Sequence, residues 1–182
     1  MKYPEKHGLI LLYTGDGRGK TTAALGTALR ACGHGMRVAM VQFIKQPKIY
    51  GELKAVKFFE PGQFPLFEIF SMGQGCTWEE PDQDVQRESA RQAWTVCQEK
   101  VVSNLYDLVI WDEIHYALDY GFLPLTPVLQ FLQNFRPPNV HILLTGRHAD
   151  PALIDLADMV SEVQEVKHHY GKGVQGQYGI EF

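Results

Sequence analysis

Short apolar runs recur along the chain and alternate with segments of helical period. The apolar runs cover residues 9–13, 38–43, 67–70, 108–111 and 141–144. Runs of this length with turn signals at their ends are typical of strands that are buried on both faces of a parallel sheet. The pattern therefore predicts an α/β fold built on a mostly parallel sheet.

Helical signals fill the segments between these runs. Residues 20–31 are rich in alanine and leucine and stop before Gly33, and residues 81–104 place small or apolar side chains at i+4 steps from Val85 to Val101. We also expect helices over 125–135 and 151–157, a last strand over 159–166, an irregular segment over 45–65, and a loop or flexible lid over 171–179. Helices on both faces of the sheet would give a three-layer αβα arrangement.

Composition fits one domain over residues 1–182. The chain has 45% hydrophobic residues, and 17 Lys+Arg against 21 Asp+Glu give a net charge of -4, so no general positive field attracts nucleic acid. Its three cysteines are scattered, which argues against a disulfide framework. The apolar run near the N-terminus is too short for a secretion signal or a membrane span. We therefore expect a cytoplasmic protein that binds neither membranes nor nucleic acid.

Residues 14–22 carry the strongest local motif, and they lie between a predicted strand and a predicted helix. The glycines let successive backbone N–H groups point at phosphate oxygens, and the helix N-terminus adds its positive end. The usual P-loop has glycine where this chain has Thr14, so Gly15 and Gly17 must shape the loop. A chance glycine-rich turn is the alternative, but motif and context agree, so the expected fold class is a P-loop NTPase-like α/β fold in three αβα layers. The expected ATP-binding residues are Gly15, Asp16, Gly17, Arg18, Gly19, Lys20, Thr21 and Thr22.

Two further positions belong to this chemistry. Asp112-Glu113 ends an apolar run, as the acidic partner of a P-loop does, and one of the two carboxylates is expected to reach a magnesium ion directly or through water. Thr21 and Glu113 are selected as the metal residues. Arg147 follows the run 141–144 at the same sheet edge, and either a phosphate contact or a surface salt bridge would explain it. The expected catalytic residues are Lys20, Glu113 and Arg147.

Histidines give a weaker signal. His115 and the pair His168-His169 lack the spacing of a zinc site, so core or solvated side chains are the simpler interpretation.

Taken in order, several stretches resemble one family. They are 14–24, 30–35, 41–45, 51–52, 77–79, 111–113, 120–125, 145–147, 156–158 and 166–181. Together they are similar to the P-loop type of ATP:corrinoid (cob(I)alamin) adenosyltransferases. The resemblance implies transfer of the 5′-deoxyadenosyl group of ATP to a Co(I) corrinoid, with release of triphosphate, in adenosylcobalamin biosynthesis or salvage. It also implies that the triphosphate is reversed relative to most P-loop enzymes, so that the ribose C5′ faces the cobalt.

The resemblance extends to partners and to the corrinoid. It implies a cobalamin or cobinamide-type substrate, Mg²⁺ or Mn²⁺, an electron-donating reductase and a homodimer. The resemblance further implies that bulky side chains wedge under the corrin and expel its lower ligand. The expected corrinoid-binding residues are Cys76 and Trp78: Trp78 is placed to supply one wedge, unless it only caps the core, and Cys76 is too small to supply another. Cys76 stands where similar sequences tend to have phenylalanine.

Two other functions are compatible with the phosphate loop. An ordinary P-loop ATPase or kinase would use Asp112-Glu113 for chemistry at the γ-phosphate. A nucleotide-gated carrier would bind a corrinoid and leave ATP intact. The phosphate product separates the three, because only adenosyl transfer releases triphosphate.

Overall fold

A single parallel sheet organises the chain. The computed structural model describes residues 7–45, 50–59, 65–73 and 83–181. Within them the strands are β1 (Ile10–Thr14), β2 (Val38–Gln42), β3 (Phe67–Ser71), β4 (Leu108–Asp112), β5 (His141–Thr145) and β6 (Met159–Glu162). They pair in the order β3-β2-β4-β5-β1-β6, with every pair parallel.

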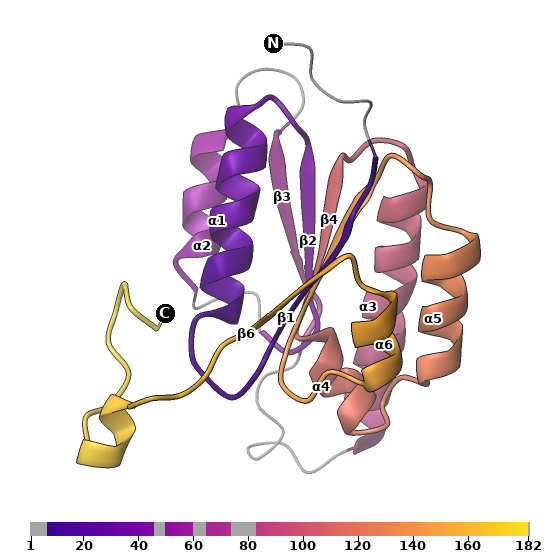
Figure 1. Cartoon of the computed structure of the whole chain (residues 1–182). Helices are drawn as coiled ribbons and strands as arrows, with labels where there is room; N and C mark the ends of the chain where they lie inside the picture. Colours follow the sequence, from indigo (N-terminus) through magenta and orange to yellow (C-terminus); the bar gives the residue numbers. More distant parts are fainter. Residues whose placement is uncertain (1–6, 46–49, 60–64, 74–82, 182) are drawn as a thin grey trace.

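Helices cover both faces of this sheet (Figure 1). One face carries α1 (Lys20–Gly33) and α2 (Glu52–Ala55), and the other carries α3 (Gln83–Val102), α4 (Ile114–Asp119), α5 (Leu125–Asn134) and α6 (Pro151–Leu156). Two short 3-10 helices, η1 (Val56–Phe59) and η2 (His169–Lys172), complete the described elements. The predicted α/β class and its three layers are confirmed.

The buried side chains form two hydrophobic clusters, one on each face of the sheet. Leu11 packs against the α1 side, whereas Leu12 packs against the α3 to α6 side, because successive side chains of a strand point to opposite faces. Ala24 and Ala28 are fully buried at i+4 spacing on α1. Their small side chains let the helix lie close to the sheet, which fixes where its N-terminal end meets β1.

Four short helices and the end of the last strand differ from the sequence-based expectation. Short helices α2 and η1 lie in the stretch expected to be irregular, and α4 and η2 were not predicted. Each has only a few residues, too few to show helical periodicity. The last strand ends at Glu162 rather than at 166. Its neighbour β1 ends at Thr14, the residue opposite Glu162, so no strand remains for the following residues to pair with.

The sheet order places three strand ends together at the carboxyl edge. β5 lies between β1 and β4, and Tyr13 on β1 is level with Thr145 on β5. The phosphate loop after β1 and the acidic residues after β4 are therefore separated by one strand, whose last residue is Thr145. Ligand sites of open α/β sheets lie at this edge.

Candidate active site

The loop between β1 and α1 turns tightly enough that two glycines adopt left-handed backbone angles. Gly15 has φ +95° and Gly19 has φ +120°, a region that side-chain-bearing residues rarely occupy. Gly17 is needed for a different reason. A Cβ atom there would lie 2.6 Å from the backbone carbonyl of Gln164, so only glycine lets the C-terminal segment pass over the loop. The expectation that Gly15 and Gly17 shape the loop agrees with this geometry.

Lys20 is buried and folds back over the loop that precedes it. Its Nζ donates hydrogen bonds to the carbonyl oxygens of Gly15, at 2.6 Å, and Gly17, at 2.8 Å. Burial lowers the pKa of Lys20, and Glu113 acts in the opposite direction. An ammonium held this way is already desolvated and positioned, so an incoming phosphate oxygen exchanges with neutral carbonyls rather than with bulk water.

Asp112 is the centre of the polar network beneath the loop. It is fully buried, and its Oδ1 accepts hydrogen bonds from the hydroxyls of Thr21 and Thr145, each at 2.8 Å. Its Oδ2 lies 3.5 Å from Lys45 Nζ and 3.4 Å from Gln42 Nε2. Sequence analysis selected Glu113 as the metal residue, whereas Asp112 is the carboxylate that contacts Thr21. Both acids stand at the strand end that the sequence indicated, and the structure shows that Asp112 is the one hydrogen-bonded to Thr21, while Glu113 stays a prediction as a metal residue.

Glu113 occupies a separate position facing the cavity. Its backbone is left-handed, with φ 64°, and its N–H donates to Thr145 Oγ1 at 2.9 Å. Its Oε2 lies against Gly146, where an added Cβ would come within 3.3 Å. Burial, and then the charge of Asp112, raise the pKa of Glu113 to about 7, against the opposing effect of Lys20.

Lys45 and Glu52 form a charged pair, and no sequence motif predicted a role for either residue. Lys45 Nζ donates to Glu52 Oε1 at 2.9 Å, and both side chains are mostly buried. Burial opposes both charges, yet Asp112 and Glu52 raise the pKa of Lys45, and Lys45 lowers the pKa of Glu52. Both residues lie in the aperiodic stretch after β2, and their membership of the resembling stretches was the one signal that pointed to them.

These groups surround a cavity of about 1050 Å³, at the upper end of the range for small-molecule sites. Residues 16–22 of the loop line it, together with Glu113 and Arg147. The structure thus brings Arg147 to the loop, as predicted from its place after β5. An apolar part of the wall comes from Leu25, Leu29, Ala55, Val56 and Phe67, and the Lys45–Glu52 pair and residues of the C-terminal segment are also part of the lining. One end of the cavity suits phosphates and the other suits flat apolar rings.

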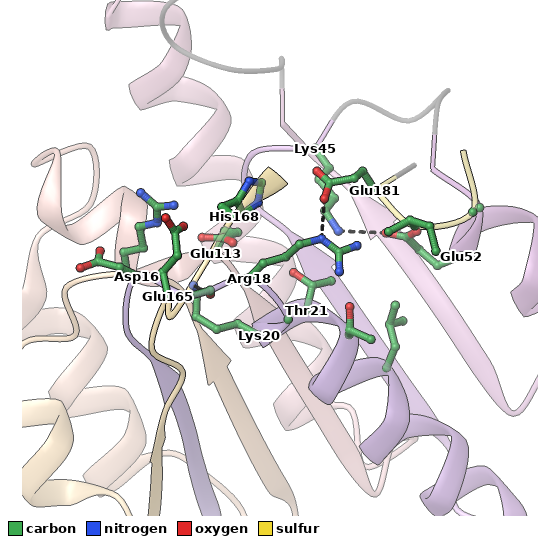
Figure 2. Close-up of a pocket in the computed structure, with 18 of the residues that line it drawn as sticks. Asp16, Arg18, Lys20, Thr21, Lys45, Glu52, Glu113, Glu165, His168 and Glu181 are labelled. Atoms are coloured by element: carbon green, nitrogen blue, oxygen red, sulfur yellow. Dashed lines mark hydrogen bonds and ion pairs between the residues drawn. The ribbon is translucent and has the colours of Figure 1, made fainter. Parts of the chain in front are cut away.

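The chain after β6 covers this cavity, and we call residues 163–181 the tail. The tail starts on the loop itself, where Val163 O accepts from Gly17 N at 2.7 Å. It returns to the loop at its end, where Glu181 Oε1 lies 2.6 Å from Arg18 Nε. Figure 2 shows Glu165, His168 and Glu181 around the same opening as Lys20 and Thr21. A covering segment was expected here, and it lies over the phosphate loop.

The remaining residues considered in the sequence lie at the surface, in the core or outside the described ranges. Asp16 Oδ1 lies 3.7 Å from His148 Nε2, and both side chains are largely exposed. His115 is fully buried, as a core histidine, and burial lowers its pKa to about 4. Cys76 and Trp78 lie outside the described residues. Among the residues that the structure describes, no helix is long and apolar enough to cross a membrane.

Comparison with known proteins gives concordant matches. The family model of the ATP:corrinoid adenosyltransferase BtuR/CobO/CobP matches residues 6–182. A corrinoid adenosyltransferase of Escherichia coli K12 is 38% identical over 178 residues, covering 98% of this chain and 87% of the relative. The corrinoid adenosyltransferase CobA of Salmonella typhimurium LT2 is 39% identical over 178 residues, with the same coverage of 98% and 87%.

Solved structures add a comparison of the fold alone. A RadB recombinase superposes with a TM-score of 0.52 at 19% identity, covering 90% of this chain and 77% of its own. A KaiC-like protein from Pyrococcus horikoshii OT3 gives a TM-score of 0.54 at 18% identity, with coverages of 91% and 75%. At this identity the likeness concerns the arrangement of sheet and helices.

Proposed function

This chain belongs to the ATP:corrinoid adenosyltransferase BtuR/CobO/CobP family and transfers the adenosyl group of ATP to a corrinoid, and we propose that the cavity above Lys20 is where the two substrates meet. The observation that carries this proposal is the composition of the cavity. Lys20 and the glycine loop line one end, and apolar side chains of α1 and η1 line the other. ATP has the same two halves, a triphosphate and a flat base.

The chain's residues act on the leaving group. A Co–C bond forms at C5′ of the ribose while the C5′–O bond to the triphosphate breaks, so negative charge accumulates on the departing oxygen. Because the cobalt of the reduced corrinoid is the nucleophile, the protein has to hold the two substrates in line and neutralise that charge. Lys20, the N–H groups of residues 15–19, Arg18 and Arg147 are the groups that we assign to this task.

The residues near Thr21 suit a hard divalent cation, Mg²⁺ or Mn²⁺, which would neutralise phosphate charge when bound. Thr21 donates its one hydroxyl proton to Asp112, so its oxygen lone pairs remain for a cation. Asp112 fixes that orientation, and Glu113 faces the cavity as the second carboxylate. We expect Glu113→Gln to raise the metal concentration needed for half-maximal activity without unfolding the protein. An unchanged metal titration would remove Glu113 from the metal site.

One assay tests the reaction at this site. Protein, ATP, metal and chemically reduced cobalamin are mixed, and the products are counted. Adenosyl transfer from this cavity predicts one light-sensitive Co–C product per triphosphate released, and both fall together when Lys20 is replaced. ADP with orthophosphate would instead indicate the ATPase reaction, and intact ATP would indicate a carrier.

We further propose the remaining features from the resemblance. They are a homodimer, a cytoplasmic location, and a reductase that delivers an electron to the bound Co(II) corrinoid. Light scattering of the purified protein measures the first directly: a mass of one chain at assay concentration would contradict it.

Trp78 and Cys76 belong to the corrinoid half of the proposal. A lower axial ligand makes Co(II) hard to reduce, and Trp78 is assigned to help expel it. Trp78→Ala should then abolish most activity with Co(II) corrinoid plus reductase and preserve much of it with pre-reduced Co(I). Cys76→Phe should be neutral or favourable in the reductase assay. Equal losses of Trp78→Ala in both assays, with normal folding, would reject this role.

A further inference from the structure

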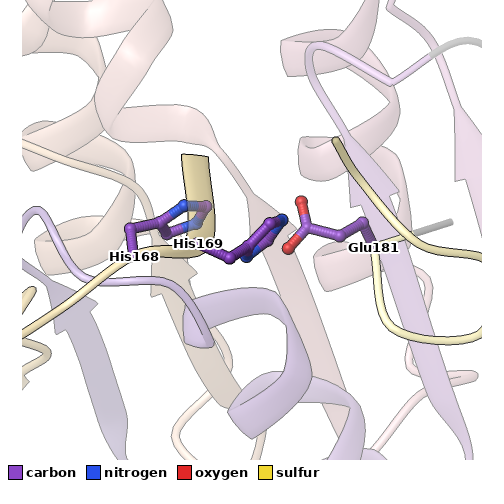
Figure 3. Close-up of side chains that lie close together, drawn as sticks. All are labelled: His168, His169 and Glu181. Carbon is purple, nitrogen blue, oxygen red and sulfur yellow. The ribbon is translucent and has the colours of Figure 1, made fainter. Parts of the chain in front are cut away.

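Three side chains of the tail converge beside the cavity, and two of them, His168 and Glu181, line it. His168 and His169 belong to the segment around η2, and Glu181 lies near the end of the chain. One ligand atom from each lies within 4.8 Å of the others. Figure 3 shows the Glu181 carboxylate directed toward the two imidazoles. The two rings are stacked, with centroids 4.5 Å apart. Sequence spacing missed this group because its third member is distant along the chain.

We propose that His168, His169 and Glu181 form a binding site for a transition-metal dication of the Zn²⁺, Co²⁺ or Ni²⁺ class. Two imidazole nitrogens and one carboxylate oxygen match the preference of these ions, whereas Mg²⁺ prefers oxygen ligands alone. Three protein ligands leave a coordination position for water. The site is distinct from the oxygen-rich site proposed at Thr21.

The ligand atoms are available at small cost. His169 Nε2 is buried and has no hydrogen-bond partner within the described part of the chain. His168 Nδ1 accepts one long hydrogen bond, 3.3 Å from the amide of Tyr170. Glu181 pairs with Arg18 through Oε1, and a carboxylate has a second oxygen to offer. A metal would therefore satisfy the buried nitrogen without breaking a strong interaction.

Ring stacking alone is an incomplete explanation of the cluster. Tyr170 also lies against both imidazoles, with centroids 4.7 Å away, so the three rings could pack together for their apolar area. Packing of this kind does not account for a buried, unpaired nitrogen beside a carboxylate, because each such atom loses its hydration. A shared cation compensates both groups.

Metal binding would cross-link the tail. Coordination joins η2 to the end of the chain, and both segments border the cavity. The tail would then hold one arrangement over the phosphate loop, as a zinc ion orders a short segment that cannot order itself. This role concerns the covering segment, so it does not depend on whether Thr21 and Glu113 bind Mg²⁺.

Titration of the full-length protein with Zn²⁺ by calorimetry, in excess Mg²⁺ and without ATP, tests the site. We expect one Zn²⁺ per chain at this site, with an affinity at least tenfold lower in His168→Ala and in His169→Ala. His34→Ala is the matched control, because His34 is an exposed histidine at the end of α1, and it should bind as the wild type does. Equal affinity of wild type and the double variant His168→Ala/His169→Ala would overturn the proposal.

Two substitutions separate ligation from tail attachment. Glu181→Gln removes both a ligand and the ion pair with Arg18, whereas Arg18→Gln removes only the ion pair. We expect the first to weaken Zn²⁺ binding at least tenfold and the second to leave it equal or tighter, since Glu181 is then released. Equal weakening by both would mean that the ion pair alone is needed and would exclude Glu181 as a ligand. Visible absorption bands of bound Co²⁺ that change in His169→Ala provide a second readout.

Discussion

The phosphate loop and the tail border the same cavity but are held in place by very different means. Lys20, Asp112 and Thr145 are buried, and each makes short hydrogen bonds to other strands or to the loop. The tail is almost entirely exposed. Among the described residues, its polar contacts with the loop are the backbone bond at Val163 and the ion pair at Glu181.

This difference indicates how work is divided in the site. The groups that we assign to the triphosphate are already positioned by these hydrogen bonds, so the proposed reaction would need little reorganisation of them. The covering segment has few buried contacts, which is typical of parts that open at low free-energy cost. Substitutions in the two regions should therefore differ in kind: those beneath the loop affect folding and catalysis, and those in the tail affect access.

The largest effect is expected at Asp112. The carboxylate of Asp112 is surrounded by four donor groups, which belong to Thr21, Thr145, Gln42 and Lys45. In Asp112→Asn an NH₂ group replaces one carboxylate oxygen, so at least one of these donors loses its acceptor and meets another donor instead. Loss of one partner in a buried charged network typically lowers the free energy of unfolding by about 3–5 kcal/mol. Urea denaturation measures it, with the exposed Asp155→Asn as control. A loss below about 1 kcal/mol would mean that the network is not a source of stability.

Replacement of Lys20 should affect catalysis more than folding. Lys20→Ala removes the charge-assisted contact that we propose for the triphosphate. Such a contact typically contributes about 1.5–3 kcal/mol, so turnover should fall about ten- to a hundredfold or more. Initial rates with pre-reduced corrinoid measure this directly. Arg30→Ala, on the exposed end of the same helix, should retain wild-type rates. Near-normal turnover of Lys20→Ala would disconnect the loop from the reaction.

Glu113 links the buried region to pH. Its pKa of about 7 in the folded state exceeds the ordinary value of 4.5, so between these values the folded protein binds more protons than the unfolded chain. Its contribution to stability is therefore present below pH 4.5 and is lost as pH rises through 7.

In Glu113→Gln the side chain cannot ionise, so the variant does not lose stability in this way as the pH rises. Relative to wild type, the variant should gain about 2 kcal/mol of unfolding free energy between pH 5.5 and pH 8. Denaturation at the two pH values measures the gain, and Glu99→Gln, an exposed change on α3, should show none. A difference that does not change with pH would mean that Glu113 titrates normally.

The smallest effect is expected in the tail. Glu181→Gln removes the partly exposed pair with Arg18, which is typically worth at most about 1 kcal/mol. We expect cleavage by trypsin after Lys167 and Lys172 to become up to about fivefold faster, with unchanged urea denaturation. Glu88→Gln, which breaks a surface contact on α3, should not alter the cleavage rate. An unchanged rate in Glu181→Gln would show that the ion pair does not hold the tail.

The fold and the phosphate loop could be predicted from the sequence, because both depend on patterns of residues that are close together along the chain. Buried strands appear as apolar runs, and residues 14–22 carry the whole phosphate motif. The choice between Asp112 and Glu113 is not local. Neighbouring residues at a strand end face different directions, and the position of Thr145, one strand away, decides which carboxylate meets Thr21. Lys45 and the tail histidines were underestimated for the same reason, because their partners are brought near only by folding.

The order of strands also bears on synthesis of the chain. β1 is synthesised before the other described strands, but its two neighbours in the sheet, β5 and β6, are among the last described elements to be made. Gly17 of the phosphate loop donates a hydrogen bond to Val163 O, and Thr21 at its end shares the Asp112 carboxylate with Thr145. A nascent chain that ends before residue 141 therefore lacks both supports. With ATP bound at the loop as proposed, we expect it to stabilise only chains that extend past Val163, so that shorter termination products cannot use nucleotide binding to resist degradation.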